Sequence, residues 1–310
     1  MTKSRGVADW GHYPPVNNNI LINPSFTVFQ RAGTTLSGDW GVDHLGSSVS
    51  YGPDRWRLKG LDRLGGTKAQ SSIDSSSGIN KLVVEYDGAT SDAYAYQYIE
   101  AINLLGLYGK EMTLSFSYSD VGGSGVPKPF IRSWDSSDNL KTLFNEVPTP
   151  LGNNRWTCTF TLTTEDGTIP DLNEVGMQVL IFINEGNIAP DEWSLWETKL
   201  EVGSAATPVI ARSHGDELAL CQRYYYTTGE LQLYYTAAAY ANGGTSATCV
   251  VDVWYPVTMR AAPILLPYTY TNMDTKSEII TPTRARLNGK PLNTANCAKV
   301  ESPLIFDAEL

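Results

Sequence analysis

Residues 156–162 have the sequence WTCTFTL, in which apolar side chains alternate with threonine. Successive side chains of an extended chain point to opposite faces of a sheet, so the alternation predicts a strand with one buried face. Threonine supports this prediction because its branched side chain fits a pleated surface. The recurrence of this period elsewhere therefore decides the fold class.

Three further stretches show that the chain is rich in strands. Residues 112–118 (MTLSFSY) and 196–202 (WETKLEV) also alternate, and both predict strands with one face in water. Residues 177–183 (MQVLIFI) are apolar almost throughout, which predicts a central strand covered on both faces. Turn signals such as LGNN at 151–154 separate the strands. An all-β chain with a β-sandwich is the expected architecture.

One short helix and a second, smaller β unit are expected after the sandwich. Residues 216–226 (DELALCQRYYY) predict the helix, because apolar residues share one face and acids begin it. Residues 203–215 have the small residues, proline and glycines of a linker. The second unit is predicted from strand patterns at 231–240, 248–255, 262–270 and 290–304, with hairpin turns at 242–244 and 288–290.

Composition narrows the class of partner. The 310 residues include 23 Lys and Arg against 33 Asp and Glu, for a net charge of −10, and no basic cluster is present. Nucleic acids and anionic membranes are held by basic residues, so neither is expected as a partner. The chain also has 17 Tyr, 8 Trp and 8 Phe. No apolar run approaches the roughly 20 residues that span a bilayer, so we expect no membrane insertion. Synthesis in a cytoplasm is expected.

Cofactor and metal motifs are missing from the sequence. The four cysteines have no zinc or redox spacing, so buried free thiols are expected at Cys158, Cys221, Cys249 and Cys297. The three histidines lie in no triad or metal motif. No cofactor is expected. Calcium has only weak support, from the loop acids Asp39, Asp43, Asp191 and Glu192.

Several ordered segments resemble phage and prophage tail-fibre or virion-surface proteins, including head fibres and decoration proteins. The segments are ILINPSFTVFQR (20–31), YGPDRWR (51–57), YIE (98–100), LEVGSAATP (200–208), ELALCQRYY (217–225) and PVTMRAAP (256–263). An opening strand with an Asn-Pro-Ser-Phe sequence, followed by a jelly-roll-like sandwich, is also similar to carbohydrate-binding modules, with Ser25 in place of a glycine.

The resemblance implies a domain plan and a place of action. Residues 1–19 would be a virion-attachment arm, 20–203 a jelly-roll β-sandwich similar to carbohydrate-binding modules, 204–226 a linker with a short helix, and 227–310 a C-terminal β-sandwich. Proteins of this kind lie on the virion, form homotrimers, contact other virion proteins of tail or capsid, and touch host polysaccharide or lipopolysaccharide. For the trimer contact we expect the helix residues Leu218, Cys221 and Tyr225.

Aromatic residues in loop-like segments are the candidates for sugar contact. Flat aromatic faces stack on the apolar side of a pyranose, and polar side chains bond its hydroxyl groups. The candidates are Trp40, Tyr51, Tyr94, Tyr96, Trp134 and Trp193. Core or interface positions are expected instead for Trp56, Trp156, Trp196 and Trp254.

A noncatalytic receptor-binding protein that recognises host surface glycans during adsorption is the leading hypothesis. A head fibre or capsid decoration protein with a structural role is the first alternative. A polysaccharide depolymerase is the second, and against it stands the absence of the long repeats of β-helical enzymes. The run Asp54-Arg55-Trp56-Arg57 favours a turn fixed by ion pairing over a catalytic acid. We therefore expect no catalytic residue.

Overall fold

The fold is taken from a computed structural model of the chain. The structure describes residues 19–31, 35–36, 49–51, 53–59, 70–74, 76, 78–85, 94–121, 126–172, 174–182, 192–228, 249–268, 270–271, 273–291, 299–300 and 304–309. The predicted attachment arm lies outside these residues, apart from Asn19. So do the predicted strand at 231–240 and the turn at 242–244.

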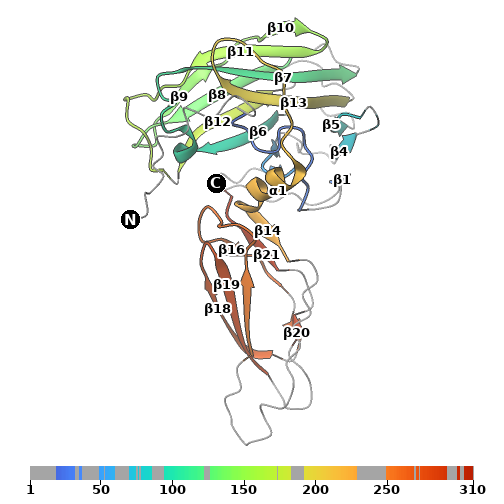
Figure 1. The fold of residues 1–310 in the computed structure, drawn as a ribbon, viewed down its shortest axis with the longest axis vertical. Helices are drawn as coiled ribbons and strands as arrows, with labels where there is room; N and C mark the ends of the chain where they lie inside the picture. The colour runs from blue at the N-terminus through green and yellow to red at the C-terminus, as the bar shows by residue number, and fades with distance from the viewer. Residues whose placement is uncertain are drawn as a thin grey trace, which may run out of the picture.

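The larger unit consists of two antiparallel sheets packed face to face (Figure 1). One sheet has seven strands in the order β1 (Thr35–Leu36), β4 (Gln70–Asp74), β5 (Lys81–Glu85), β13 (Glu192–Val202), β7 (Glu111–Val121), β11 (Arg155–Thr161) and β10 (Thr149–Gly152). The other has six strands in the order β2 (Val49–Tyr51), β3 (Arg57–Lys59), β6 (Tyr94–Glu100), β12 (Val175–Phe182), β8 (Lys128–Trp134) and β9 (Leu140–Phe144). The predicted sandwich is confirmed.

A single apolar core lies between the two sheets. Leu114 and Phe116 of β7 enter it from one sheet, and Val179 and Ile181 of β12 enter it from the other. The stretch at 156–162 behaves as predicted, because Cys158 and Phe160 are buried in this core. Strand β12 lies between β6 and β8, so the prediction of a central strand is also confirmed.

The predicted turn at 151–154 joins β10 to β11. Gly152, Asn153 and Asn154 have φ angles of 86°, 51° and 61°. Glycine and asparagine are the residues that tolerate this left-handed region most readily, which explains the LGNN sequence.

The expectation of a wet face is wrong for β7 and β13. Ser115, Lys199 and Glu201 are all buried. Lys199 pairs with Glu201 at 3.1 Å, and both bond Thr207 of the stretch that follows β13. Residues 203–208 therefore do not act as a free linker, because they fold back over the outer face of the seven-stranded sheet. A bulge between Trp196 and Lys199 also changes which side chains of β13 face the core.

The smaller unit is also all-β and has its own core. One sheet has the strand order β14 (Tyr225–Thr227), β21 (Ile305–Asp307) and β16 (Ile264–Leu265). Another has the order β15 (Cys249–Trp254), β19 (Arg284–Pro291) and β18 (Met273–Ile280). Strand β17 (Tyr270–Thr271) pairs with β20 (Lys299–Val300). The core contains Tyr255, Leu287 and Phe306. Strand β15 confirms the pattern at 248–255. The turn predicted at 288–290 is wrong, since β19 runs through it. Of the strand predicted at 290–304, the structure describes the last two residues of β19, β20 and Leu304.

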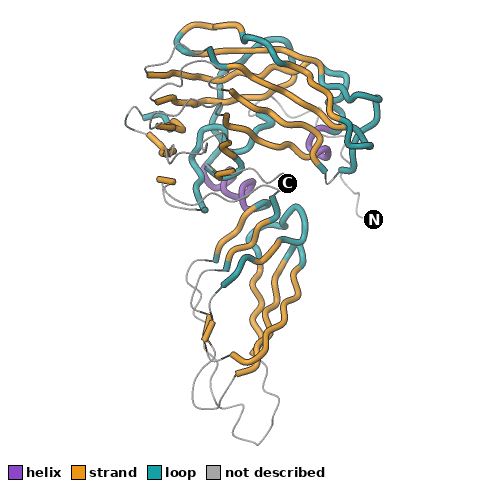
Figure 2. The backbone as a smooth tube through the Cα atoms, turned by 180° about the vertical axis from the view of Figure 1, so that it is seen from behind, coloured by secondary structure: helices purple, strands orange, loops and turns teal. Residues whose placement is uncertain are grey.

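The helix α1 (His214–Gln222) lies between the two units, as Figure 2 shows from behind. The Ser213 side chain caps it by accepting a hydrogen bond from the Asp216 N–H. The predicted helix continued to residue 226, but Tyr225 and Tyr226 instead pair with β21. The 3₁₀ turn η2 (Ala101–Leu104) follows β6. The described residues therefore form two β units with one short α-helix, as expected.

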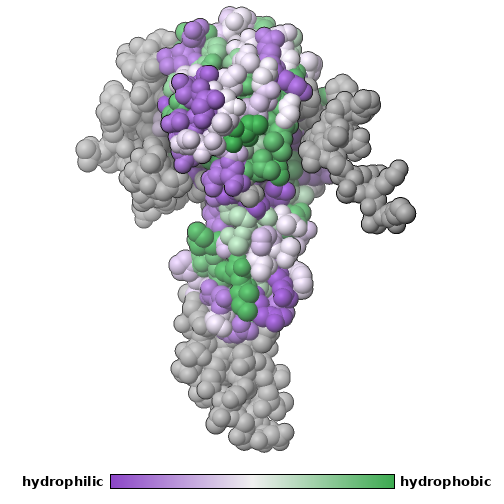
Figure 3. Space-filling model, turned by 90° about the vertical axis from the view of Figure 1, so that its left-hand side faces the viewer, coloured by the Kyte–Doolittle hydropathy of each residue, from purple (hydrophilic) through white to green (hydrophobic). Residues whose placement is uncertain are grey.

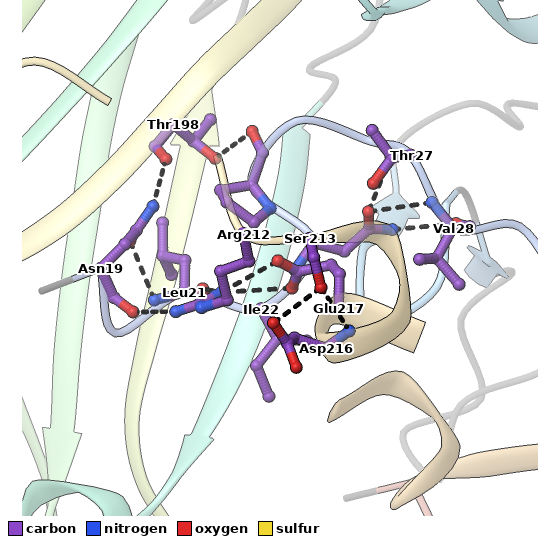
Figure 4. Close-up of polar contacts among 12 residues, drawn as sticks. Asn19, Leu21, Ile22, Thr27, Val28, Thr198, Arg212, Ser213, Asp216 and Glu217 are labelled. Atoms are coloured by element: carbon purple, nitrogen blue, oxygen red, sulfur yellow. Dashed lines mark hydrogen bonds and ion pairs between the residues drawn. The ribbon is translucent and has the colours of Figure 1, made fainter. Parts of the chain in front are cut away.

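The opening segment 20–31 is not the strand expected from its sequence. It runs as bends and turns between the sandwich and α1, with Asn23 and Phe26 at φ angles of 53° and 52°. Buried polar contacts satisfy its backbone in place of a strand partner (Figure 4). The sequence pattern alone did not distinguish such a segment from a strand.

Gly176 of β12 supports a test of the sandwich packing. A Cβ atom there would lie 2.8 Å from both Ala101 Cα and Leu104 Cδ1 of η2. We expect Gly176→Ala to lower the free energy of unfolding by about 2 kcal/mol, because overpacking displaces a rigid backbone. Urea unfolding measures it. Gly215→Ala is the control, since its Cβ would meet only Ser213 Oγ at 4.0 Å; a loss no larger than the control's would contradict the packing.

Candidate functional site

The outer face of the six-stranded sheet gathers aromatic and polar side chains. In β6, Ala95 and Ile99 point into the main core, so Tyr94, Tyr96 and Tyr98 point outward by alternation. The neighbouring strands β8 and β12 alternate in the same way. We call this surface the aromatic face, and its residues are Tyr94, Tyr96, Tyr98, Phe130, Arg132, Trp134, Gln178 and Leu180.

Strand register places these side chains in rows across three strands. Leu180 of β12 lies opposite Tyr96 on one side and Phe130 on the other. Gln178 lies between Tyr98 and Arg132. Side chains directly opposite each other on a sheet are within contact distance, so the residues of each row are direct neighbours.

The rings on the aromatic face form a continuous series. The ring centroids of Tyr94 and Tyr96 are 5.8 Å apart, and those of Tyr96 and Tyr98 are 5.4 Å apart. Tyr98 then meets Trp134 edge to face at 6.2 Å. Tyr96, at 2% exposure, forms the buried floor with Leu180, while Tyr94, Tyr98, Phe130 and Trp134 are half-buried around it. This arrangement offers apolar ring surface beside hydroxyl groups.

Arg132 supplies a positive charge to the aromatic face. Its guanidinium lies 4.0 Å from the centroid of the Phe130 ring. Burial lowers the pKa of Arg132, and the neighbouring Tyr94 and Tyr98 partly offset that effect. The group stays charged near neutral pH because an arginine pKa starts far above that range. Gln178, directly opposite, adds an amide that can both donate and accept hydrogen bonds.

Three of the six predicted aromatics meet on this face. Tyr94, Tyr96 and Trp134 lie there together, although Tyr96 is buried and not exposed as expected. Trp193 is wrong as a ligand contact, because it packs in the sandwich core at 1% exposure. Trp40 lies outside the described residues, and only the backbone of Tyr51 is described, in β2.

Sequence reasoning missed Tyr98, Phe130, Arg132 and Gln178. The signal for Tyr98 was available, since YAYQY at 94–98 places three tyrosines at alternate positions on one face. No comparable signal existed for Arg132 and Gln178, because their meeting depends on the pairing of β8 with β12.

The tryptophans expected in core or interface positions divide into two groups. Trp56 is fully buried, Trp196 is buried, and Trp156 packs against the sandwich core. Trp254 is 64% exposed, so a core position is wrong for it. It lies on the smaller unit, where Figure 3 shows a green apolar strip on the described surface.

The side chains expected at a trimer contact are largely used within one chain. Cys221 is fully buried, and Tyr225 is covered by the Arg31 guanidinium at 4.1 Å from its ring centroid. Only Leu218 is half-buried. The prediction is therefore wrong for Cys221 and Tyr225, while the trimer itself stays a prediction that light scattering can test.

The charged run Asp54-Arg55-Trp56-Arg57 serves the junction between the two units. Asp54 accepts hydrogen bonds from the Gln30 backbone and side chain, and Arg55 pairs with Glu309 near the C-terminus. Asp54, Arg55 and Arg57 are all buried. Arg55 does form an ion pair, but its partner is Glu309 and not the neighbouring Asp54 of the predicted turn. The carboxylates of Asp54 and Glu309 are both bonded to protein groups.

A second polar cluster at the junction is also satisfied internally. The Asn23 and Asn19 side chains bond backbone groups around them, and Arg212 bonds Glu217 at the start of α1 (Figure 4). Residues of all six segments that carry the resemblance, 20–31, 51–57, 98–100, 200–208, 217–225 and 256–263, are connected by hydrogen bonds or ion pairs here. These segments, far apart in the sequence, therefore belong to one packed junction.

The described residues give no sign of a metal centre or a reactive thiol. No group of three His, Cys, Asp or Glu that could hold a metal ion occurs among them. Of the proposed calcium ligands, Glu192 lies in β13, and Asp39, Asp43 and Asp191 lie outside the described residues. Cys158 and Cys221 are free and buried, and burial raises the pKa of Cys158 to about 12. Within the described ranges, no helix is long and apolar enough to span a bilayer.

Comparison with known proteins finds partial likenesses of structure. No protein-family model matches the chain, and no curated protein matches it. A cellulose-binding domain of a Cellulomonas fimi β-1,4-glucanase is 15% identical with a TM-score of 0.33, over 55% of this chain and 100% of that one. The enzymatically active domain of tailspike protein 4 of bacteriophage CBA120 is 13% identical with a TM-score of 0.30, over 48% of this chain and only 19% of that one.

A Stig cyclase from Fischerella sp. TAU is similar to a comparable extent. It is 13% identical with a TM-score of 0.34, and the match covers 61% of this chain and 98% of the cyclase. A carbohydrate binder, a tailspike domain and a cyclase thus have similar scores. No ligand or activity follows for this chain from such likenesses.

Proposed function

We propose that the chain is a noncatalytic glycan-binding protein of a phage virion surface. The observation that carries glycan binding is the series of rings from Tyr94 to Trp134, with Arg132 and Gln178 beside it. Aromatic surface next to hydrogen-bonding groups matches the apolar face and the hydroxyl groups of a sugar. The place on a virion, and adsorption to host polysaccharide or lipopolysaccharide, are supported by the resemblance of the ordered segments.

The composition of the aromatic face favours binding over hydrolysis. Glycoside hydrolysis generally needs two carboxyl groups on either side of the bond that is cut. The aromatic face includes no Asp or Glu. Glu100, at the end of β6, already bonds the Tyr224 hydroxyl and pairs with Arg223 and Arg260. A depolymerase is therefore the weaker alternative, and release of reducing ends from host polysaccharide would revive it.

A head fibre or capsid decoration protein remains the structural alternative. It would have the same fold and resemblance but no affinity for glycans. Cryo-electron microscopy of the virion would separate the two by the location of the chain.

Loss of Trp134 tests glycan binding directly. We expect Trp134→Ala to weaken binding to any glycan that the protein recognises on an array by about tenfold or more, since stacking on an indole ring is lost. Isothermal titration with that glycan measures the affinity. Trp254→Ala is the matched control, because Trp254 is exposed on the smaller unit and has its own arginine neighbour, Arg284. Equal affinities for the two variants and the unmodified protein would contradict the proposal.

A further inference from the structure

Arg132 is unusual among the described arginines because no described carboxylate forms an ion pair with it. Among the described residues, ion pairs are formed by Arg31, Arg55, Arg155, Arg212, Arg223, Arg260, Arg284 and Arg286. Arg132 forms none with the described part of the chain, and its buried Nε has no hydrogen-bond acceptor. Partly buried charge without a partner is costly, so its presence calls for an explanation.

The surroundings of Arg132 are neutral and suited to a ligand. Its guanidinium stacks on Phe130, and in register it lies between Gln178 of β12 and Thr142 of β9. Tyr94 and Tyr98 are the neighbours that partly offset the effect of burial on the pKa of Arg132, and both contribute hydroxyl groups to the face. A planar guanidinium binds carboxylate or phosphate through two parallel hydrogen bonds. The Arg132 Nε–H, which has no acceptor among the described residues, is one of the donors that this pair of hydrogen bonds can use.

We propose that the aromatic face recognises an anionic glycan, whose carboxylate or phosphate group pairs with Arg132 while a sugar ring stacks on the neighbouring aromatic side chains. This inference rests on the proposed glycan-binding function and adds the charge of the ligand to it. The chain as a whole is acidic, with a net charge of −10, so attraction of an anion depends on local cations, and Arg132 is the one that stacks on Phe130 within the face. A neutral glycan would leave the partly buried charge of Arg132 without an anionic partner in the complex.

Two pairs of glycans test the inference by isothermal titration. One pair is a hexuronate oligosaccharide and the same oligosaccharide after reduction of its carboxylates to alcohols. The other is a phosphorylated glycan before and after phosphatase treatment. We expect removal of the anionic group to weaken binding at least tenfold in one pair, which identifies carboxylate or phosphate as the partner. Equal binding of charged and neutral forms would overturn the inference and leave glycan binding intact, whereas no binding of any glycan would overturn both.

Variants of Arg132 connect this charge preference to the residue. Arg132→Gln is expected to weaken binding of the anionic glycan at least tenfold and to leave its neutral counterpart unchanged, while Arg132→Lys restores part of the affinity. Arg286→Gln is the control, because Arg286 forms a surface ion pair with Asp252 at 2.8 Å on the other unit. An equal loss for charged and neutral glycans would mean that Arg132 only supports the shape of the face, which would overturn the inference.

Discussion

Asn23→Ala is expected to lower the free energy of unfolding by about 4 kcal/mol, close to the whole stability of many domains. The Asn23 side chain donates to the carbonyl oxygens of Val28 and Asp54, and it accepts from the N–H groups of Thr27 and Val28. Asn23 is fully buried, so alanine would remove the bonds that its side chain makes with the buried Val28 N–H and Asp54 carbonyl, and would leave the Val28 carbonyl with only the Asp54 N–H as donor. Its φ of 53° adds strain for alanine.

Two comparisons separate the causes of this loss. Asn23→Gly removes the same hydrogen bonds but accepts the positive φ, so it should be less destabilised than Asn23→Ala by about 1 kcal/mol. Asn288→Ala is the matched control, because Asn288 makes one exposed hydrogen bond to Ser277 Oγ at 3.3 Å; its effect should stay within about 0.5 kcal/mol. Urea unfolding measures all three. If Asn23→Ala behaves like Asn288→Ala, the opening segment is not organised around Asn23.

Glu309→Gln is expected to cost about 3 kcal/mol at neutral pH, because it breaks a buried cluster of charges. Glu309 pairs with Arg31 at 3.0 Å and with Arg55, and it ties the last residues of the chain to the larger unit. Burial alone would raise the pKa of Glu309. Arg55 and Arg31, followed by Arg57 and Arg260, outweigh burial and hold the pKa below its usual value of 4.5.

The lowered pKa gives this effect a defined pH dependence. A carboxylate whose pKa is depressed by folding stabilises the folded state fully above its unfolded pKa, and that stabilisation is lost as pH falls through the folded pKa. The difference between Glu309→Gln and the unmodified protein should therefore be constant from pH 7.5 to about 5.5 and shrink below about 4.5. Urea unfolding across this range measures it. Asp252→Asn, in an exposed ion pair, is the control, and a Glu309→Gln difference that does not depend on pH would contradict the ion-pair account.

Local alternation predicted much of the fold, and long-range pairing explains what it missed. The strands predicted at 156–162 and 177–183 are β11 and β12, as expected. Their own patterns, alternating in one and apolar almost throughout in the other, are enough to predict how each strand is buried. The burial of Lys199 and Glu201 could not be predicted, since it depends on a bulge in β13 and on residues 203–208 folding back. The irregular path of residues 20–31 likewise depends on partners about 30 and 190 residues away, Asp54 and Glu217.

The candidate site shows the same division. The sequence predicts that Tyr94, Tyr96 and Trp134 lie in loop-like segments, whereas they lie in β6 and β8. Nothing local in the sequence indicates that both strands pair with β12 and so bring these residues to one face. Trp193 was misplaced for the same reason, because its strand, β13, lies in the other sheet. Nothing in the sequence indicates a binding role for Arg132, since the lack of an ion pair with the described residues depends on how the sheet is assembled.

Binding of glycan on the aromatic face is tested by ¹⁹F NMR of protein labelled with 5-fluorotryptophan. The chain has 8 tryptophans, and single Trp→Phe variants assign each resonance. During titration with a glycan that the protein binds, we predict that the Trp134 resonance shifts, while those of the buried Trp56 and Trp193 and the distant Trp254 stay in place. A shift of Trp254 with Trp134 unchanged would contradict the account and move the binding site to the smaller unit.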